Sequence, residues 1–179
     1  MAAHTFSYPP LILPFVNLIF LSHHSYIKPI GGIYIMNETY QKTIAILRSL
    51  SLYYQTIHWL ANGSQYYGDH LLLQRLYDAV TPEIDTIGEK ALGILKQEAA
   101  VNLVENISMV SKILNNMEYG SVEVCFNSAV KLERAFIMFC GEQAKSVENS
   151  EGVKNLFAGM ADKHEGHVYL LQQRLGESK

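Results

Sequence analysis

From Met36 onward, apolar residues recur at alternating intervals of three and four positions, which is the period of an amphipathic α-helix. The clearest such stripe consists of Ile44, Leu47, Ser51, Tyr54 and His58. The pattern predicts four long helices, at about 38–61, 68–96, 121–146 and 150–175, and a shorter helix at about 102–115. No strand-length stretch of period two follows Met36, so the sequence predicts an all-α fold.

Residues that favour turns and caps separate these stretches. Asn62-Gly63-Ser64 is expected to end the first helix, and Asp69 is a candidate to open the second. Pro82 lies inside the second helix, where a proline should kink the helix or remove one backbone hydrogen bond. Gly176 is expected to end the last helix.

The short helix at 102–115 lies between the second and third long helices, where a simple up-and-down bundle needs only a short loop. The two long helices on either side of it must therefore be joined by a long crossover. A four-helix bundle with this connection is the ferritin-like architecture.

Composition places the chain among globular proteins with one domain of ordinary size. It has 179 residues, of which 49% are hydrophobic, and its formal net charge is −3. This charge argues against nucleic-acid binding through a broad positive field. Cys125 and Cys140 stand on one predicted helix, about 22 Å apart along its axis, too far to pair within the chain. A reducing, cytoplasmic environment fits best.

Residues 1–35 differ from the remainder. They hold one charged residue, Lys28, and an apolar run from Leu11 to Leu21 that is shorter than the ~20 residues needed to span a bilayer. We interpret 1–35 as an apolar N-terminal extension that is disordered or not native, and 36–179 as the folded domain, with no membrane association expected. The alternative for this extension is a membrane anchor or a docking peptide.

Candidate chemistry lies around the turn between the first two helices and further along the second. His58 and His70 are twelve residues apart, Asp85 follows His70 by fifteen, and Glu89 follows Asp85 by four. The last spacing places both carboxylates on one helix face. Two imidazoles and two carboxylates suit ferrous iron, with manganese and zinc as competitors.

Helix length restricts how these four residues can act together. At 1.5 Å per residue, Asp85 lies about 22 Å and Glu89 about 28 Å beyond His70 on the same axis. No single metal site in one chain can hold all four. Either the residues are unrelated, or two chains pair about a two-fold axis, so that the histidine end of one helix meets the carboxylate end of the other.

The segment from His58-Trp59-Leu60-Ala61-Asn62-Gly63 to His70, followed by Asp85-x-x-x-Glu89, resembles the ferroxidase signature of the Dps family, the DNA-binding proteins from starved cells. The end of the last helix, His167-Val168-Tyr169, is also similar, and the resemblance covers about residues 38–175.

The resemblance implies a hollow homododecamer with two-iron ferroxidase centres at its dimer interfaces. His58 and His70 would come from one subunit and Asp85 and Glu89 from its partner, with Trp59 beside the site to absorb stray oxidising equivalents. Ferrous iron would be oxidised preferentially by hydrogen peroxide and stored as ferric mineral, which protects against oxidative stress.

The sequence departs from the family pattern in two respects. Gln74 stands four residues after His70, where the family often has an acidic residue, and its amide removes one potential oxygen ligand. Residues 36–47 contain only Lys42 as a basic residue, whereas DNA-binding members usually carry a lysine-rich arm, so DNA binding is not expected.

Two other functions compete with the ferroxidase hypothesis. A ferritin or bacterioferritin site inside one bundle needs Glu-x-x-His on two helices, but Leu92 follows Glu89 and Val168 follows Glu165 at the required spacing. A structural or DNA-compacting shell with weak ferroxidase activity is the second alternative.

His164 and His167 follow the apolar stripe of the last helix. This position favours buried, hydrogen-bonded histidines over a second metal site.

Overall fold

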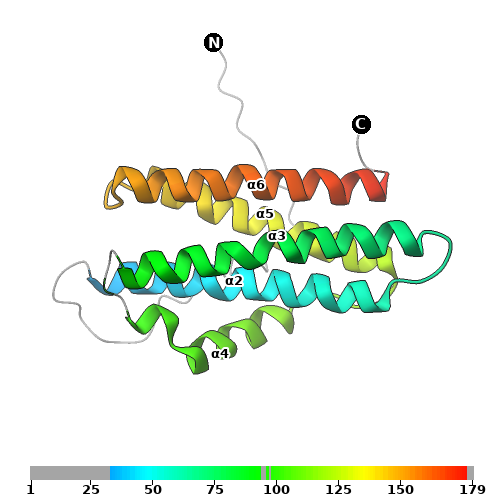
Figure 1. The fold of residues 1–179 in the computed structure, drawn as a ribbon, viewed down its shortest axis with the longest axis horizontal. Coiled ribbons are helices and arrows are strands. Elements are labelled where there is room, and N and C mark those ends of the chain that lie inside the picture. The colour runs from blue at the N-terminus through cyan, green and yellow to red at the C-terminus, as the bar shows by residue number, and fades with distance from the viewer. Residues whose placement is uncertain (1–32, 94–95, 97, 177–179) are drawn as a thin grey trace, which may run out of the picture.

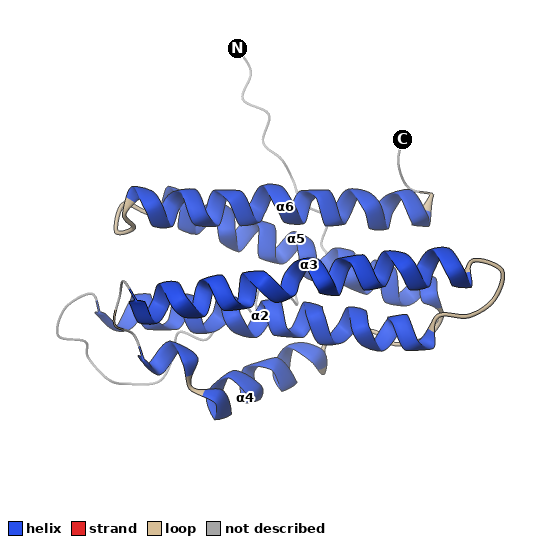
Figure 2. Cartoon of the chain, viewed as in Figure 1, coloured by secondary structure: helices blue, strands red, loops and turns tan. Residues whose placement is uncertain are grey.

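The computed structural model describes residues 33–93, 96 and 98–176, and within these ranges the chain is helical with no strand (Figure 2). The long helices are α2 (Ile33–Leu60), α3 (Tyr66–Gly93), α5 (Val122–Lys145) and α6 (Glu151–Leu175). A short 3-10 helix, η2 (Glu98–Val101), and helix α4 (Leu103–Leu114) stand between α3 and α5. The predicted all-α class is confirmed.

The four long helices form two antiparallel pairs, α2 with α3 and α5 with α6, laid against one another (Figure 1). Helices α3 and α5 run in the same direction, so the chain must return along the bundle between them. Helix α4 lies on the outside of α2 within this return. The bundle with a crossover between its second and third long helices confirms the ferritin-like architecture expected from the sequence.

The core follows the helical stripes of the sequence. Large side chains that are almost completely buried include Tyr40, Tyr53, Tyr54, Phe126, Phe136, Phe157, Leu47, Leu50, Leu73 and Leu76. Burial of each large apolar side chain contributes about 1.5–3 kcal/mol, and this term holds the two helix pairs together.

Polar caps and glycines set the ends of the helices. The side chains of Ser121 and Ser150 accept hydrogen bonds from backbone N–H groups in the first turns of α5 and α6, and Asn102 does the same for α4. Gly63, with φ +82°, allows the tight turn between α2 and α3. Gly176, with φ +74°, ends α6 in the left-handed conformation, as predicted.

The helix bounds and the role of Asp69 differ from the sequence-based expectations. Helix α2 begins at Ile33, before the predicted position 38, and α3 ends at Gly93 instead of 96. Asp69 does not open α3, which begins at Tyr66; Asp69 lies within its first turn, buried. Pro82 lies on the exposed side of α3, which continues through it, so the second of its two expected effects applies: the missing N–H leaves one carbonyl of the previous turn without its helical hydrogen bond.

Residues 1–32 of the predicted extension, with the apolar run from Leu11 to Leu21, lie outside the described residues. Among the helices of the described ranges, none is both long and apolar enough to cross a bilayer.

Candidate functional site

His58 and His70 lie against each other at one end of the bundle. His58 is in the last turn of α2 and His70 in the first turns of α3, and the tight turn through Gly63 brings the two helices back together. The two imidazole rings are stacked, with centroids 3.6 Å apart and planes inclined by 23°. His58 is buried and His70 half-buried. The structure therefore forms the histidine pair that the sequence spacing suggested.

Backbone hydrogen bonds fix the orientation of both rings. Nδ1 of His58 lies 2.8 Å from the carbonyl oxygen of His70, and Nδ1 of His70 lies 3.2 Å from the carbonyl oxygen of His58. Since a carbonyl only accepts, Nδ1 carries a proton in each ring, and in the neutral ring Nε2 is therefore the nitrogen with the lone pair. Among the described residues neither Nε2 atom has a hydrogen-bond partner. This is the tautomer that metal-binding histidines adopt when a second group holds the other nitrogen.

Aromatic side chains surround the histidine pair. The ring of Tyr77 meets His58 edge-on at 5.4 Å, and Tyr66 lies 5.2 Å from His70. Trp59, the next residue after His58, is 69% exposed.

Asp85 and Glu89 are exposed and lie one helical turn apart on α3, nearer to its other end. Both line a surface hollow between α2, α3 and η2. Arg48 and Leu92 are among the other residues that line this hollow. The two carboxylates thus share one accessible, partly apolar depression.

The structure does not bring these carboxylates to the histidines within one chain. Asp85 follows His70 by fifteen positions of the uninterrupted helix α3, which corresponds to about 22 Å. Gln74, where the family pattern has an acidic residue, is exposed one turn after His70. One subunit therefore carries two separate half-sets of candidate ligand residues.

A buried polar cluster in the bundle joins the two histidines of α6 to two carboxylates that were not predicted from the sequence. Glu133 of α5 and His164 of α6 are completely buried, and His167 and Glu83 almost so. Nδ1 of His164 lies 2.5 Å from Oε2 of Glu133, and Nε2 of His164 lies 2.9 Å from Oε2 of Glu83. Nδ1 of His167 lies 3.2 Å from Oε1 of Glu133, to which the Tyr54 hydroxyl also donates. The expectation that His164 and His167 are buried and hydrogen-bonded is confirmed.

The charges in this cluster stabilise one another. Burial alone would raise the pKa of Glu133, but the charge and hydrogen bond of His164 outweigh it and lower the pKa to about 2. Burial alone would lower the pKa of His164, but Glu133, with a smaller effect from Glu83, raises it to about 9. Lys163 forms an ion pair with Glu83 at the surface end of the cluster.

The sequence held a signal for the two missed carboxylates. Glu133 stands between Ala129 and Phe136 at helical spacing, on the apolar stripe of α5. Glu83 occupies the corresponding position between Val80 and Ile87 on α3. A charged residue in an apolar stripe is rarely left unpaired, so both positions pointed to a buried partner.

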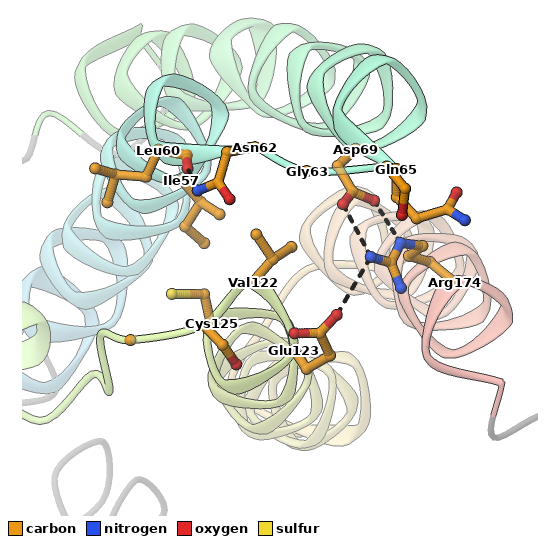
Figure 3. A pocket seen from close by; sticks show the side chains of 13 residues that line it. Ile57, Leu60, Asn62, Gly63, Gln65, Asp69, Val122, Glu123, Cys125 and Arg174 are labelled. Atoms are coloured by element: carbon orange, nitrogen blue, oxygen red, sulfur yellow. Dashed lines mark hydrogen bonds and ion pairs between the residues drawn. The ribbon is translucent and has the colours of Figure 1, made fainter.

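A second polar feature closes the end of the bundle near the histidine pair. Arg174 of α6 binds both carboxylate oxygens of Asp69, one of them at 2.9 Å, and reaches Glu123 of α5 at 3.5 Å (Figure 3). Its guanidinium also lies over the ring of Phe126, 5.6 Å from the centroid. These contacts join the end of α6 to the beginnings of α3 and α5, so Asp69 and Arg174 act as a structural clamp.

Cys125 and Cys140 are buried free thiols, as expected. Burial raises the pKa of Cys140 well above its usual range, and the nearby carboxylates of Glu83 and Glu133 raise it further. Neither thiol is placed for nucleophilic chemistry.

Comparison with known structures supports the fold. The crystal structure of Dps from Thermosynechococcus elongatus superposes with a TM-score of 0.71 at 20% sequence identity, and the match covers 82% of this chain and 93% of that one. The chain therefore has a Dps-like, ferritin-like fold. A scan against protein-family models gives no match, and a search of curated protein sequences gives none either.

Proposed function

We propose that this chain is a mini-ferritin of the Dps type, a ferroxidase that oxidises ferrous iron, preferably with hydrogen peroxide, and stores the ferric product. The observation that carries the proposal is the paired arrangement of His58 and His70. Both rings are fixed by backbone hydrogen bonds through Nδ1, which leaves Nε2 as the nitrogen that can bind a metal ion in the neutral ring. Histidine rings that are oriented in this way are suited to bind a metal ion, whereas packing alone would not require this orientation.

The other half of the proposed site is the carboxylate pair Asp85 and Glu89. Hard carboxylate oxygens complement the imidazole nitrogens for ferrous iron. Since α3 separates the two half-sets within one subunit, the proposed site takes its carboxylates from a second copy of the chain. A two-fold axis then produces two equivalent sites for each dimer.

The surface of the subunit supports association with another copy. Helix α4 exposes Leu103, Val104 and Ile107, and α2 exposes Leu52 and Trp59 on one face, seven residues apart. Several large apolar side chains exposed on neighbouring helices are typical of an interaction surface. We propose that they lie in subunit contacts of a closed shell, a homododecamer built from two-fold dimers, located in the cytoplasm.

The proposed reaction uses iron as its substrate. Two ferrous ions each give up one electron, and the O–O bond of hydrogen peroxide accepts both electrons together with two protons to form two water molecules. The protein holds both ions near one peroxide molecule, so that both electrons pass to the same O–O bond and no hydroxyl radical is released. Removing ferrous iron and peroxide together accounts for protection against oxidative stress.

The direct test is stopped-flow measurement of ferrous oxidation after peroxide is added. His58→Ala and Asp85→Ala should each slow the reaction at least tenfold, whereas Glu142→Ala, an exposed residue of α5, should leave it unchanged. Equal rates in all of these proteins would refute the ferroxidase proposal.

A mixed assembly tests whether the site is shared. Subunits carrying His58→Ala and Asp85→Ala, coexpressed with different tags, pair randomly. Each mixed dimer then has one site with both substitutions and one site with none, so about a quarter of all sites are intact. Activity should return to about that fraction. If the mixed protein is as inactive as the two parents, the four residues do not form a site across the interface.

A further inference from the structure

We propose that Glu133, His164 and His167 bind a divalent transition-metal ion inside the helix bundle of each subunit, with Glu83 orienting His164. This site is separate from the proposed ferroxidase centre, and its residues come from one chain. It does not depend on ferroxidase activity.

The geometry brings three ligand atoms together. One nitrogen of His164, one nitrogen of His167 and one carboxylate oxygen of Glu133 all lie within 4.8 Å of one another. Among the described residues, no other three histidine, cysteine, aspartate or glutamate side chains have ligand atoms that all lie within this distance of one another. His164 and His167 are three residues apart on α6, so both rings project from one helix face toward Glu133 of α5.

In both rings, the nitrogen that faces the carboxylate of Glu133 is Nδ1. Nδ1 of His164 faces Oε2 of Glu133, and Nδ1 of His167 faces Oε1 of the same residue. An ion bound between them replaces the protons on these two nitrogens. Each ring then carries a single proton, on Nε2: a ring that was protonated on both nitrogens releases its Nδ1 proton to solvent, and a neutral ring moves its one proton from Nδ1 to Nε2.

Glu83 supplies the support that a ligand histidine requires. Its Oε2 lies 2.9 Å from Nε2 of His164, on the side of the ring away from Glu133. A histidine that binds a metal through one nitrogen generally donates from the other to a carboxylate or carbonyl, which fixes the ring. Lys163, whose side chain is partly exposed, holds Glu83 in turn. The chain of contacts thus runs from the surface to the proposed ion.

The donor set indicates the class of ion. Two imidazole nitrogens and one carboxylate oxygen suit zinc or ferrous iron, and they leave at least one coordination position open. Bonds of about 2.0–2.2 Å to each ligand require ligand atoms to stand about 3.3 Å apart. The contacting atoms of Glu133 and His164 must therefore move apart by somewhat less than 1 Å from their present distance of 2.5 Å when an ion binds.

A purely structural ion network is the competing explanation, because both carboxylate oxygens of Glu133 already accept hydrogen bonds. One observation favours metal binding: two histidines and Tyr54 converge on the single carboxylate of Glu133, where one partner would neutralise the charge. Stability alone does not require such a network, because replacing buried ionic groups by apolar residues often leaves stability unchanged.

The test uses the full chain carrying Asp85→Asn and Glu89→Gln, which removes the carboxylate half of the ferroxidase centre. Zinc binding is measured by equilibrium dialysis, and cobalt(II) is added separately as a spectroscopic probe, since nitrogen-bound cobalt in a site of low coordination number gives intense visible bands. Within this background, Glu133→Gln and His167→Gln are compared with Glu142→Gln, a matched change on the exposed face of α5. Circular dichroism and gel filtration establish that each protein is folded.

We expect one zinc ion to bind per subunit. Glu133→Gln and His167→Gln should each weaken this binding at least tenfold and abolish the visible cobalt bands, while Glu142→Gln should bind zinc as the parent protein does. If Glu133→Gln fails to fold, His167→Gln, at the edge of the cluster, decides the question. If no zinc binds, or if neither substitution weakens its binding, the proposal is overturned and the cluster is an ion network alone. Because Glu133 and His167 lie outside the proposed ferroxidase centre, and the carboxylates of that centre are already removed, this outcome is independent of iron oxidation.

Discussion

His58 and His70 stack face to face across the turn between α2 and α3, and each ring faces the other residue's backbone carbonyl through Nδ1. The two helices are therefore joined at the point where the proposed iron ligands lie. A change in the backbone of the turn would alter the direction of both Nε2 atoms together. The geometry of the histidine half-site is a property of this helix pair and needs no partner subunit.

In the proposed iron site, the amide of Gln74 stands one turn after His70, where a carboxylate would supply a hard oxygen ligand. Gln74→Glu should raise the rate of ferrous oxidation at limiting iron about fivefold, which corresponds to about 1 kcal/mol of added binding energy. Stopped-flow traces across a range of iron concentrations measure this change. Gln173→Glu, an equal change of charge at an exposed position of α6, is the control. A rate no higher than that of the control would contradict the role given to position 74.

Trp59 provides an intrinsic probe of assembly. It is the only tryptophan of the chain, and 69% of it is exposed in the isolated subunit. If a partner covers the histidine half-site, Trp59 is shielded in the assembled protein. Dissociation should then move its fluorescence emission to longer wavelength and increase quenching by iodide. Equal quenching of assembled and dissociated protein would argue that no partner lies over this surface.

The exposed apolar face of α4 should be required for association. Ile107→Asp places a charge among Leu103 and Val104, where burial against another subunit would leave it unpaired. Analytical ultracentrifugation should show a shift from the assembled species toward the monomer, with helical content unchanged. Val147→Asp, at a 92% exposed position between α5 and α6, is the matched control and should assemble normally. Normal assembly of Ile107→Asp would place α4 outside the subunit contacts.

The helices could be predicted closely because their signal is local. The spacing of Leu47, Tyr54 and similar residues directly reports which side of a helix is buried, and Ser121, Ser150 and Gly176 mark helix ends through their own side chains or backbone. The pairing of His58 with His70 was also within reach, since only a short turn separates their helices.

The buried polar contacts could not be predicted because their partners are remote in the sequence. Asp69 near the start of a helix has the local appearance of a cap, but its partner Arg174 is 105 residues away. Glu133 similarly meets His164, 31 residues further on. Only the packing of α3, α5 and α6 decides which charged residues on those helices meet. The partners of Asp85 and Glu89 could not be predicted from local sequence either, because in the proposed site they belong to another chain.

The clamp between Asp69 and Arg174 should contribute strongly to stability. Asp69 is 1% exposed, so removal of the guanidinium in Arg174→Met leaves a buried carboxylate without its counter-ion. The free energy of unfolding should fall by about 3 kcal/mol, the range found when one partner of a buried pair is removed. Urea denaturation followed by circular dichroism measures this loss.

Two further variants separate the clamp from general effects of charge. Lys154→Met removes a pair with Glu151, whose side chain is 83% exposed, and should cost less than about 1 kcal/mol. The double variant Asp69→Leu/Arg174→Met removes both charges, so much of the lost stability should return because no unpaired carboxylate stays buried. If the double variant is less stable than Arg174→Met by the full cost of a second independent substitution, the two residues are not coupled. In that case the end of α6 is held by the contact of Arg174 with Phe126 and not by the ion pair.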